Sequence, residues 1–142
     1  MLLNKLEFWL MNNKIRAIIQ DQLEAKRFRR LSSLNTGKVV LEIGCGNGVG
    51  ANLINKYFKP SANYAIDLDN KMIDLARKRY PNSNCIFEVV DATKLKYPAS
   101  FFDAAFDFKI IHHISNWQDC INELYRVLKP NGELLIEDLS AE

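Results

Sequence analysis

The chain has 142 residues, of which 48% are hydrophobic and 25% charged, and a formal net charge of +2. These values are typical of one soluble globular domain with its own core, and so small a charge does not indicate a nucleic-acid or membrane-surface protein. The three cysteines are widely spaced without a C-x-x-C pair, which argues against disulfides and a zinc site. Lys5 and Glu7 interrupt the apolar N-terminus, so we expect no signal peptide, no membrane span and a cytoplasmic location.

Residues 1–34 are predicted to form an N-terminal helical extension. Apolar side chains recur in it at helical spacing, less regularly toward the end: Ile15, Ile18, Ile19, Leu23, Phe28 and Leu31. The basic cluster at residues 26–30 complements the helix dipole, while a second interpretation makes it an amphipathic helix for a membrane surface. Phe8 and Trp9 are expected to close over a ligand crevice as a lid, against the alternatives of a packed helix and a membrane anchor.

The stretch from residue 39 to residue 50 is the most informative part of the chain. Residues 39–43 are apolar and partly β-branched, as in a buried strand. Glycines follow at every second position from Gly44 to Gly50, and apolar residues at helical spacing continue to Phe58. A strand, a glycine turn and a helix N-terminus let backbone amides approach a ligand closely, so the stretch predicts a nucleotide-type cofactor site.

Two glycine patterns compete for the identity of this cofactor. Residues 46–51 satisfy G-x-G-x-x-A, which is typical of dinucleotide-binding oxidoreductases. Residues 42–48 satisfy acid-x-G-x-G-x-G, and here the sequence resembles the class I S-adenosylmethionine (SAM) methyltransferases. Glu42 would repel a pyrophosphate, and no Lys or Arg lies between Val39 and Lys56 to offset it. The sulfonium and ammonium groups of SAM suit a nearby carboxylate, so we favour SAM over NAD.

The rest of the chain alternates strands with helices. Strands are expected at residues 63–67, 84–90, 102–108 and 133–137, with a turn at 129–132. Asp69 and Asn116 are expected to cap helices that end near residues 80 and 128. The alternation predicts an α/β fold, an open Rossmann-like parallel sheet in the order 3-2-1-4-5 with helices on both faces.

Residues 35–142 would form this SAM-binding core. Members of the resembling family continue past the fifth strand, so we expect the core to be incomplete at its C-terminal end. The apolar fifth strand would then be an exposed edge, available to pair with a second copy of the chain as a dimer.

An acidic residue follows or ends each of the first four strands: Glu42, Asp67, Asp91 and Asp107. In an open parallel sheet these strand ends border the ligand crevice. Together with His112-His113 and the sequence from Leu124 to Gly132, they extend the resemblance over residues 38–138. Five motifs in the right order are specific to the family, whereas each motif alone is loose: residues 40–48, residues 65–67, Asp91-Ala92, the strand that begins at Phe102-Asp103 together with His112-His113, and residues 124–132.

The resemblance implies roles at the methionine end of SAM. Gly44, Cys45 and Gly46 would present backbone to the methionine part, and Glu42 would order the turn or reach the ammonium through water. Phe108 would contribute backbone nearby. The sequence departs from the family pattern just after it, since Lys109 stands where small or apolar residues are usual.

The resemblance also implies roles at the adenosine end. Asp67 would accept from the ribose hydroxyls, and it follows the glycine turn at about the spacing expected of such an acid. Leu68 and Met72 would pack against the adenine. Asp91 would accept from the adenine amino group, with the amide of Ala92 facing the ring.

No side-chain nucleophile is required, because methyl transfer is a direct displacement that depends mainly on positioning. Asp107, His112 and His113 are the candidates for a general base. Two adjacent histidines do not share a face of a helix or strand, and no third ligand is evident, so we expect no metal site.

The resemblance favours methyl transfer from SAM to a small molecule or a lipid precursor, with S-adenosylhomocysteine (SAH) as product. The strand end at residues 107–109 lacks the Asn/Asp-Pro-Pro-aromatic motif of base-amino methyltransferases, which argues against a nucleic-acid substrate. An NAD-binding oxidoreductase domain and a non-catalytic SAM-binding module are the alternatives.

Overall fold

The computed structural model describes Lys5, Trp9 and residues 19–137. Two short helices of other than α type, a π-helix (η1) and a 3₁₀-helix (η2), occur beside the α-helices. The elements in chain order are η1 (Gln20–Ala25), α3 (Lys26–Leu31), β1 (Val39–Ile43), α4 (Val49–Phe58), β2 (Ala62–Asp67), α5 (Asn70–Arg79), β3 (Cys85–Val89), β4 (Phe102–Phe108), η2 (Ile111–His113), α6 (Trp117–Val127) and β5 (Leu128–Glu137).

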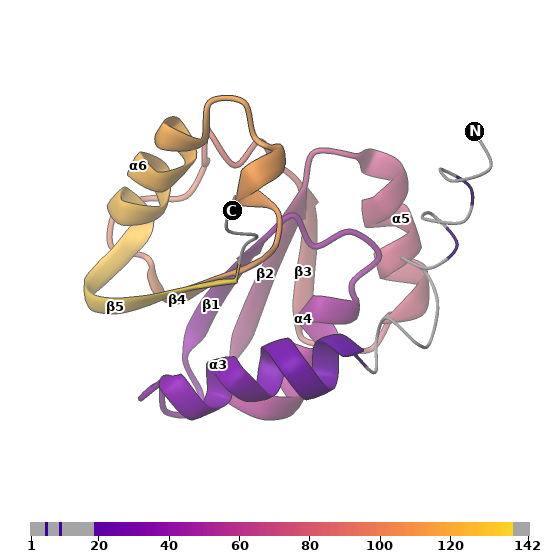
Figure 1. Cartoon of the computed structure of the whole chain (residues 1–142), viewed down its shortest axis with the longest axis horizontal. Helices are drawn as coiled ribbons and strands as arrows, with labels where there is room; N and C mark the ends of the chain where they lie inside the picture. Colours follow the sequence, from indigo (N-terminus) through magenta and orange to yellow (C-terminus); the bar gives the residue numbers. More distant parts are fainter. Residues whose placement is uncertain (1–4, 6–8, 10–18, 138–142) are drawn as a thin grey trace.

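The five strands form one sheet in the order β3-β2-β1-β4-β5, and every neighbouring pair is parallel (Figure 1). This confirms the predicted Rossmann-like order. The chain moves outward from β1 on one side through β2 and β3, and on the other side through β4 and β5. Ligands of such sheets bind where the two halves diverge, here between β1 and β4. β5 is an edge strand, and its use in a dimer stays a prediction.

Helices cover both faces of the sheet, because side chains of successive strand residues point to opposite faces. Leu41 and Ile43 of β1 pack on the face that Cys120 and Leu124 of α6 cover. Val40 of β1 faces the other side, where the buried partners come from α3, α4 and β4: Phe28, Ile54, Phe58, Ala104, Phe106 and Phe108. Ile73 and Ala76 of α5 extend this second layer over β2 and β3.

One of the two predicted helix caps forms. Asp69 Oδ1 accepts a hydrogen bond from Lys71 N at 2.9 Å and caps α5. Asn116 occupies the N-cap position of α6, but its side chain makes no capping bond there, so that prediction is wrong. The Asn116 amide donates instead to the carboxylate of Asp119 at 3.3 Å, which takes the side chain away from the backbone it was expected to cap.

We expect Asp69→Ala to lower the free energy of unfolding by about 1 kcal/mol, because the Lys71 amide loses its acceptor. Asn116→Ala is the matched control and should cost less than half as much. Urea denaturation of both variants measures the difference. Equal losses would contradict the assignment of Asp69 as the effective cap.

The predicted turn at residues 129–132 is wrong, because strand β5 begins directly after α6. Leu128 pairs with Phe102, and the next pair joins Glu133 to Ala104. Residues 129–132 therefore bulge outward opposite Asp103. An edge strand tolerates Pro130 and the left-handed Asn131 (φ +66°) in such a bulge, since no other strand that the structure describes pairs with this edge.

Of the predicted apolar stripe that the structure describes in the N-terminal segment, Phe28 is buried and the other members are exposed. Ile19, Leu23 and Leu31 are 48%, 54% and 73% exposed, whereas Glu24, Ala25 and Phe28 are buried. The buried positions 24, 25 and 28 lie three and four residues apart, which is ordinary helical spacing, so the inward side lies next to Leu23 and does not include it. Ile15, Ile18 and Phe8 lie outside the described residues, and Trp9 is 59% exposed, so the lid stays a prediction. Among the helices that the structure describes, none is both long and apolar enough to cross a membrane.

Candidate functional site

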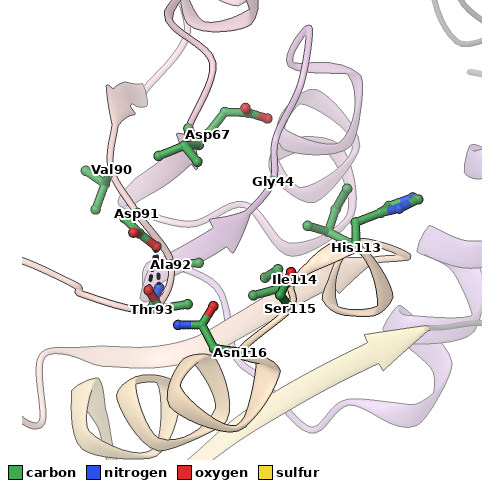
Figure 2. A pocket seen from close by; sticks show the side chains of 12 residues that line it. Gly44, Asp67, Val90, Asp91, Ala92, Thr93, His113, Ile114, Ser115 and Asn116 are labelled. Atoms are coloured by element: carbon green, nitrogen blue, oxygen red, sulfur yellow. Dashed lines mark hydrogen bonds between the residues drawn. The ribbon is translucent and has the colours of Figure 1, made fainter.

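A cavity of about 420 Å³ opens at the carboxyl ends of the strands, where parallel sheets of this kind bind ligands. The glycine turn after β1, the end of β2, the segment after β3 and the loop after β4 each supply part of its wall (Figure 2). The lining residues are Gly44, Asp67, Leu68, Val90, Asp91, Ala92, Thr93, Ile110, His113, Ile114, Ser115 and Asn116.

Backbone hydrogen bonds fix the glycine turn. Cys45 N donates to Ile66 O at 2.8 Å, and Gly48 N donates to Cys45 O at 3.0 Å. Gly44 has φ +63°, and a Cβ atom there would come within 2.4 Å of the Ile110 side chain. Gly46 has φ +51°, and no atom of the described residues lies within 4 Å of its Cβ position, so the turn leaves open space on that side. Glycine is therefore required at 44 by packing and favoured at 46 by backbone conformation.

Asp67 links the end of β2 to the glycine turn. Its Oδ2 accepts from Gly46 N, and its Oδ1 accepts from Asp69 N, both at 2.9 Å. These two bonds fix the carboxylate in the wall of the cavity. A carboxylate there offers acceptor oxygens to hydroxyl groups, in line with the predicted ribose role.

Asp91 and Thr93, which follow the neighbouring strand β3, form the next part of the wall (Figure 2). Asp91 Oδ1 accepts from Thr93 N at 2.9 Å and from Thr93 Oγ1 at 2.7 Å. These hydrogen bonds lower the pKa of Asp91, because they stabilise the charged form. Asp91 is thus an ionised acceptor at neutral pH, suited to an amino group.

Acidic side chains surround the glycine turn. Glu42 is 2% exposed, and burial, followed by the charges of Asp107 and Asp67, raises its pKa to about 8. Its Oε2 has no hydrogen-bond partner among the residues that the structure describes. A cationic ligand group would stabilise the ionised form of this carboxyl, whereas a pyrophosphate would disfavour that form. The donor and acceptor set therefore fits SAM better than NAD.

The structure brings part of the predicted site together. Gly44, Asp67, Leu68, Asp91, Ala92 and His113 line the cavity. Glu42, Cys45 and Gly46 belong to the β1 end and glycine turn beside it, and Met72 is half-buried on α5. The predicted roles of these residues stay predictions.

Three of the predicted residues lie away from the cavity wall. The ring of Phe108 packs against Phe28, with ring centroids 5.1 Å apart, on the face of the sheet that α3 covers. Asp107 is fully buried and accepts from Ile110 N at 2.8 Å, and His112 is exposed with its ring against that of His113.

Sequence reasoning missed most of the loop after β4, in which only His112 and His113 were named as candidates. Ile110, Ile114, Ser115 and Asn116 line the cavity from this loop, and Val90 and Thr93 flank the predicted Asp91. The position of the loop could have identified it, because it directly follows the fourth strand, whose carboxyl end was predicted to border the ligand crevice. Within the described part of the chain, no group of three His, Cys, Asp or Glu side chains is placed to hold a metal ion.

Comparison with known proteins identifies relatives of this chain. The fatty-acid O-methyltransferase of Mycolicibacterium smegmatis is 34% identical over 102 residues, which cover 72% of this chain and 37% of that protein. Phosphoethanolamine N-methyltransferase 3 of Arabidopsis thaliana is 35% identical over 115 residues, which cover 80% of this chain and 23% of that protein. The chain thus spans 23% to 38% of the length of the first curated relatives.

Solved structures share the fold. Phosphoethanolamine N-methyltransferase 2 of Haemonchus contortus, in complex with phosphomonomethylethanolamine and SAH, superposes with a TM-score of 0.72 at 29% identity, over 81% of this chain and 27% of that chain. A SAM-dependent methyltransferase of Aquifex aeolicus superposes with a TM-score of 0.74 at 22% identity, over 87% of this chain and 66% of that chain. The family model described as a methyltransferase domain matches residues 41–136, which is more than half of the chain. The chain therefore belongs to the methyltransferase domain family, within the class I SAM-dependent methyltransferases.

Proposed function

We propose that this chain is the cofactor-binding core of a methyltransferase that transfers a methyl group from SAM to a small-molecule or lipid-precursor acceptor. The observation that carries the proposal is the cavity at the strand ends, with Asp67 and Asp91 in its wall and an acidic glycine turn beside it. Family membership supports the same cofactor.

The chain's own residues would hold the two ends of the cofactor. Asp67 accepts from the ribose hydroxyls, and Asp91 accepts from the adenine amino group, with Leu68 and Ala92 against the ring. The glycine turn and Glu42 surround the methionine end. Bound SAM supplies a methyl group already activated by its sulfonium, so the protein has to orient the acceptor and exclude water.

The general base, if the acceptor needs one, is proposed to be His113. Of the three candidates it is the one that lines the cavity, whereas Asp107 is buried and bonded to the Ile110 amide. His113 follows β4 in the same loop as Ile114 and Ser115, which border the cavity. Geometry thus favours His113 as the group able to reach a bound acceptor.

The acceptor class rests on the relatives. The named relatives are methyltransferases of fatty acids and of phosphoethanolamine. We carry over only the coarse class, a small molecule or lipid precursor, because the chain spans a minor part of those proteins.

Isothermal titration calorimetry with SAM, SAH and NAD tests the proposal. We expect SAM and SAH to bind with one site per chain and NAD to produce no binding heat. Binding of NAD without a response to SAH would overturn the methyltransferase assignment and restore the oxidoreductase alternative.

We expect Asp67→Ala to weaken SAH binding by about 1–3 kcal/mol, because the ribose hydroxyls and the Gly46 amide both lose a charged acceptor. Asp74→Ala on α5 is the control, since its carboxylate is 66% exposed and outside the cavity wall. Calorimetry with SAH compares the two variants with the parent. An Asp67→Ala variant that binds like Asp74→Ala would show that the site is misplaced.

A further inference from the structure

An ion pair joins the N-terminal segment to the end of strand β4. Lys109 Nζ contacts Glu24 Oε1, and Glu24, on η1, is only 3% exposed. A buried carboxylate is costly to leave without a counter-charge, so this contact constrains where the Lys109 side chain can lie. Residues distant in sequence are thereby connected next to the proposed site.

The backbone at Lys109 adopts a conformation that lysine rarely takes. Its φ is +64°, in the left-handed region that favours glycine. Lys109 N donates to Glu137 O at 2.7 Å, which fixes the same residue against β5. The turn is therefore held from two sides, by its amide and by its side chain. Strained conformations of this kind persist where the surrounding contacts determine them, and they are common at functional sites.

The next residue carries the turn into the cavity. Ile110 N donates to Asp107 Oδ1 at 2.8 Å, and the Ile110 side chain packs directly over Gly44. Ile110 also lines the cavity with Asp67 and Asp91. A continuous set of contacts thus runs from Glu24 through Lys109 and Ile110 to the glycine turn.

We infer that Glu24 and Lys109 are positioning residues for the cofactor site: their ion pair fixes the left-handed turn that presses Ile110 onto Gly44. The N-terminal segment then contributes to the shape of the site without lining it. The role in binding rests on the proposed function, whereas the role in placing Ile110 does not. The competing view is that the pair only fastens η1 to the sheet.

Hydrogen exchange of the protein without ligand tests the placement of Ile110. In Glu24→Gln we expect the amides of Ile110 and Gly46 to exchange faster by a larger factor than core amides such as that of Tyr64 on β2. A pair that merely fastens the helix would accelerate all of these amides through the same loss of global stability. Equal acceleration, or none, would overturn the inference.

SAH binding, measured below the unfolding transition, gives the second readout. We expect Glu24→Gln and Lys109→Met each to weaken binding about tenfold through a misplaced cavity wall, and Lys109→Arg to retain the parent affinity. The double variant with both Glu24→Gln and Lys109→Met should bind SAH no more weakly than the single variant of lower affinity, because either change breaks the same contact. Lys129→Met is the matched control, since Lys129 pairs with Asp103 at 3.2 Å near the opposite end of β4.

The outcomes separate this inference from the proposed function. A parent that fails to bind SAH contradicts the proposed function, and hydrogen exchange then decides the inference alone. A parent that binds SAH, with unchanged affinity in folded Glu24→Gln, contradicts the inference alone. If Lys109→Met does not fold, Lys109→Gly takes its place, since glycine keeps the left-handed turn without the ion pair and should still weaken binding.

Discussion

Gly44→Ala is expected to lower the free energy of unfolding by about 2–4 kcal/mol and to abolish SAH binding. A Cβ atom at residue 44 would come within 2.4 Å of Ile110 Cγ1 and within 2.8 Å of Ile110 Cβ. Ile110 is held by its own hydrogen bond to Asp107, so it cannot give way without moving the cavity wall. Urea denaturation and calorimetry with SAH measure the two effects.

Two controls separate the overlap with Ile110 from the strain at φ +63°. Gly37→Ala introduces alanine at φ +79° where the described part of the chain places no atom within 4 Å of the new Cβ, so it should cost only the backbone strain, about 1–2 kcal/mol. In an Ile110→Gly background, Gly44→Ala should cost less than in the parent, because the overlapping side chain is gone. Equal costs for Gly44→Ala and Gly37→Ala would contradict the packing of Ile110 on the turn.

The sheet and the principal acids of the site could be predicted because they are encoded locally. The strand, the glycine turn and the helix of residues 39–58 can be recognised from the residue pattern of that short stretch alone. Asp67 and Asp91 follow strands directly, so strand order alone brings them to one edge. The placement of the two acids follows from pairing rules that apply to any parallel sheet.

The loop after β4 could not be predicted, because its course depends on distant contacts. The turn at Lys109 is held by Glu24 and Glu137, and neither partner is near it in sequence. Lys109 could be seen to depart from the family pattern, but nothing local indicated a buried acid to receive it. The parts of the wall formed by Ile110, Ile114, Ser115 and Asn116 therefore came only from the structure.

The buried side of the N-terminal segment was predicted only in part, for a different reason. The predicted stripe joined Leu23 to Phe28, which are five residues apart, whereas residues on one face of a helix lie three or four apart. The inward positions then include Glu24 and Ala25 instead of Leu23. The predicted stripe would place Glu24 in solvent, whereas Glu24 is buried and pairs with Lys109.

Glu42→Gln is expected to change how stability depends on pH. The pKa of the Glu42 carboxyl is raised from 4.5 to about 8 by burial and by the charges of Asp107 and Asp67. Between these two values the folded protein keeps the proton and the unfolded chain has lost it, so stability is full below pH 4.5 and falls as pH rises toward 8. The loss approaches about 1.4 kcal/mol per pH unit within this window. Glutamine does not ionise, so the stability of the variant relative to the parent should rise from pH 5 to pH 8.

Urea denaturation at pH 5, 6, 7 and 8 measures this relative stability. Asp74→Asn is the control, because Asp74 is exposed on α5 and its difference from the parent should stay flat across the same range. If the stability difference between Glu42→Gln and the parent does not change with pH, Glu42 is already ionised in the folded protein near pH 5.

The same carboxyl predicts a proton linkage in cofactor binding. At pH 7 Glu42 is largely protonated without ligand, and the sulfonium and ammonium of SAM would favour its ionised form. SAM binding should therefore release up to one proton per site in the parent and none from this residue in Glu42→Gln. Calorimetry in buffers of different ionisation enthalpy counts that proton, because the observed heat changes with the buffer by the number of protons released. SAM binding with proton uptake, or equal release in parent and variant, would place the positive charge of the cofactor away from Glu42.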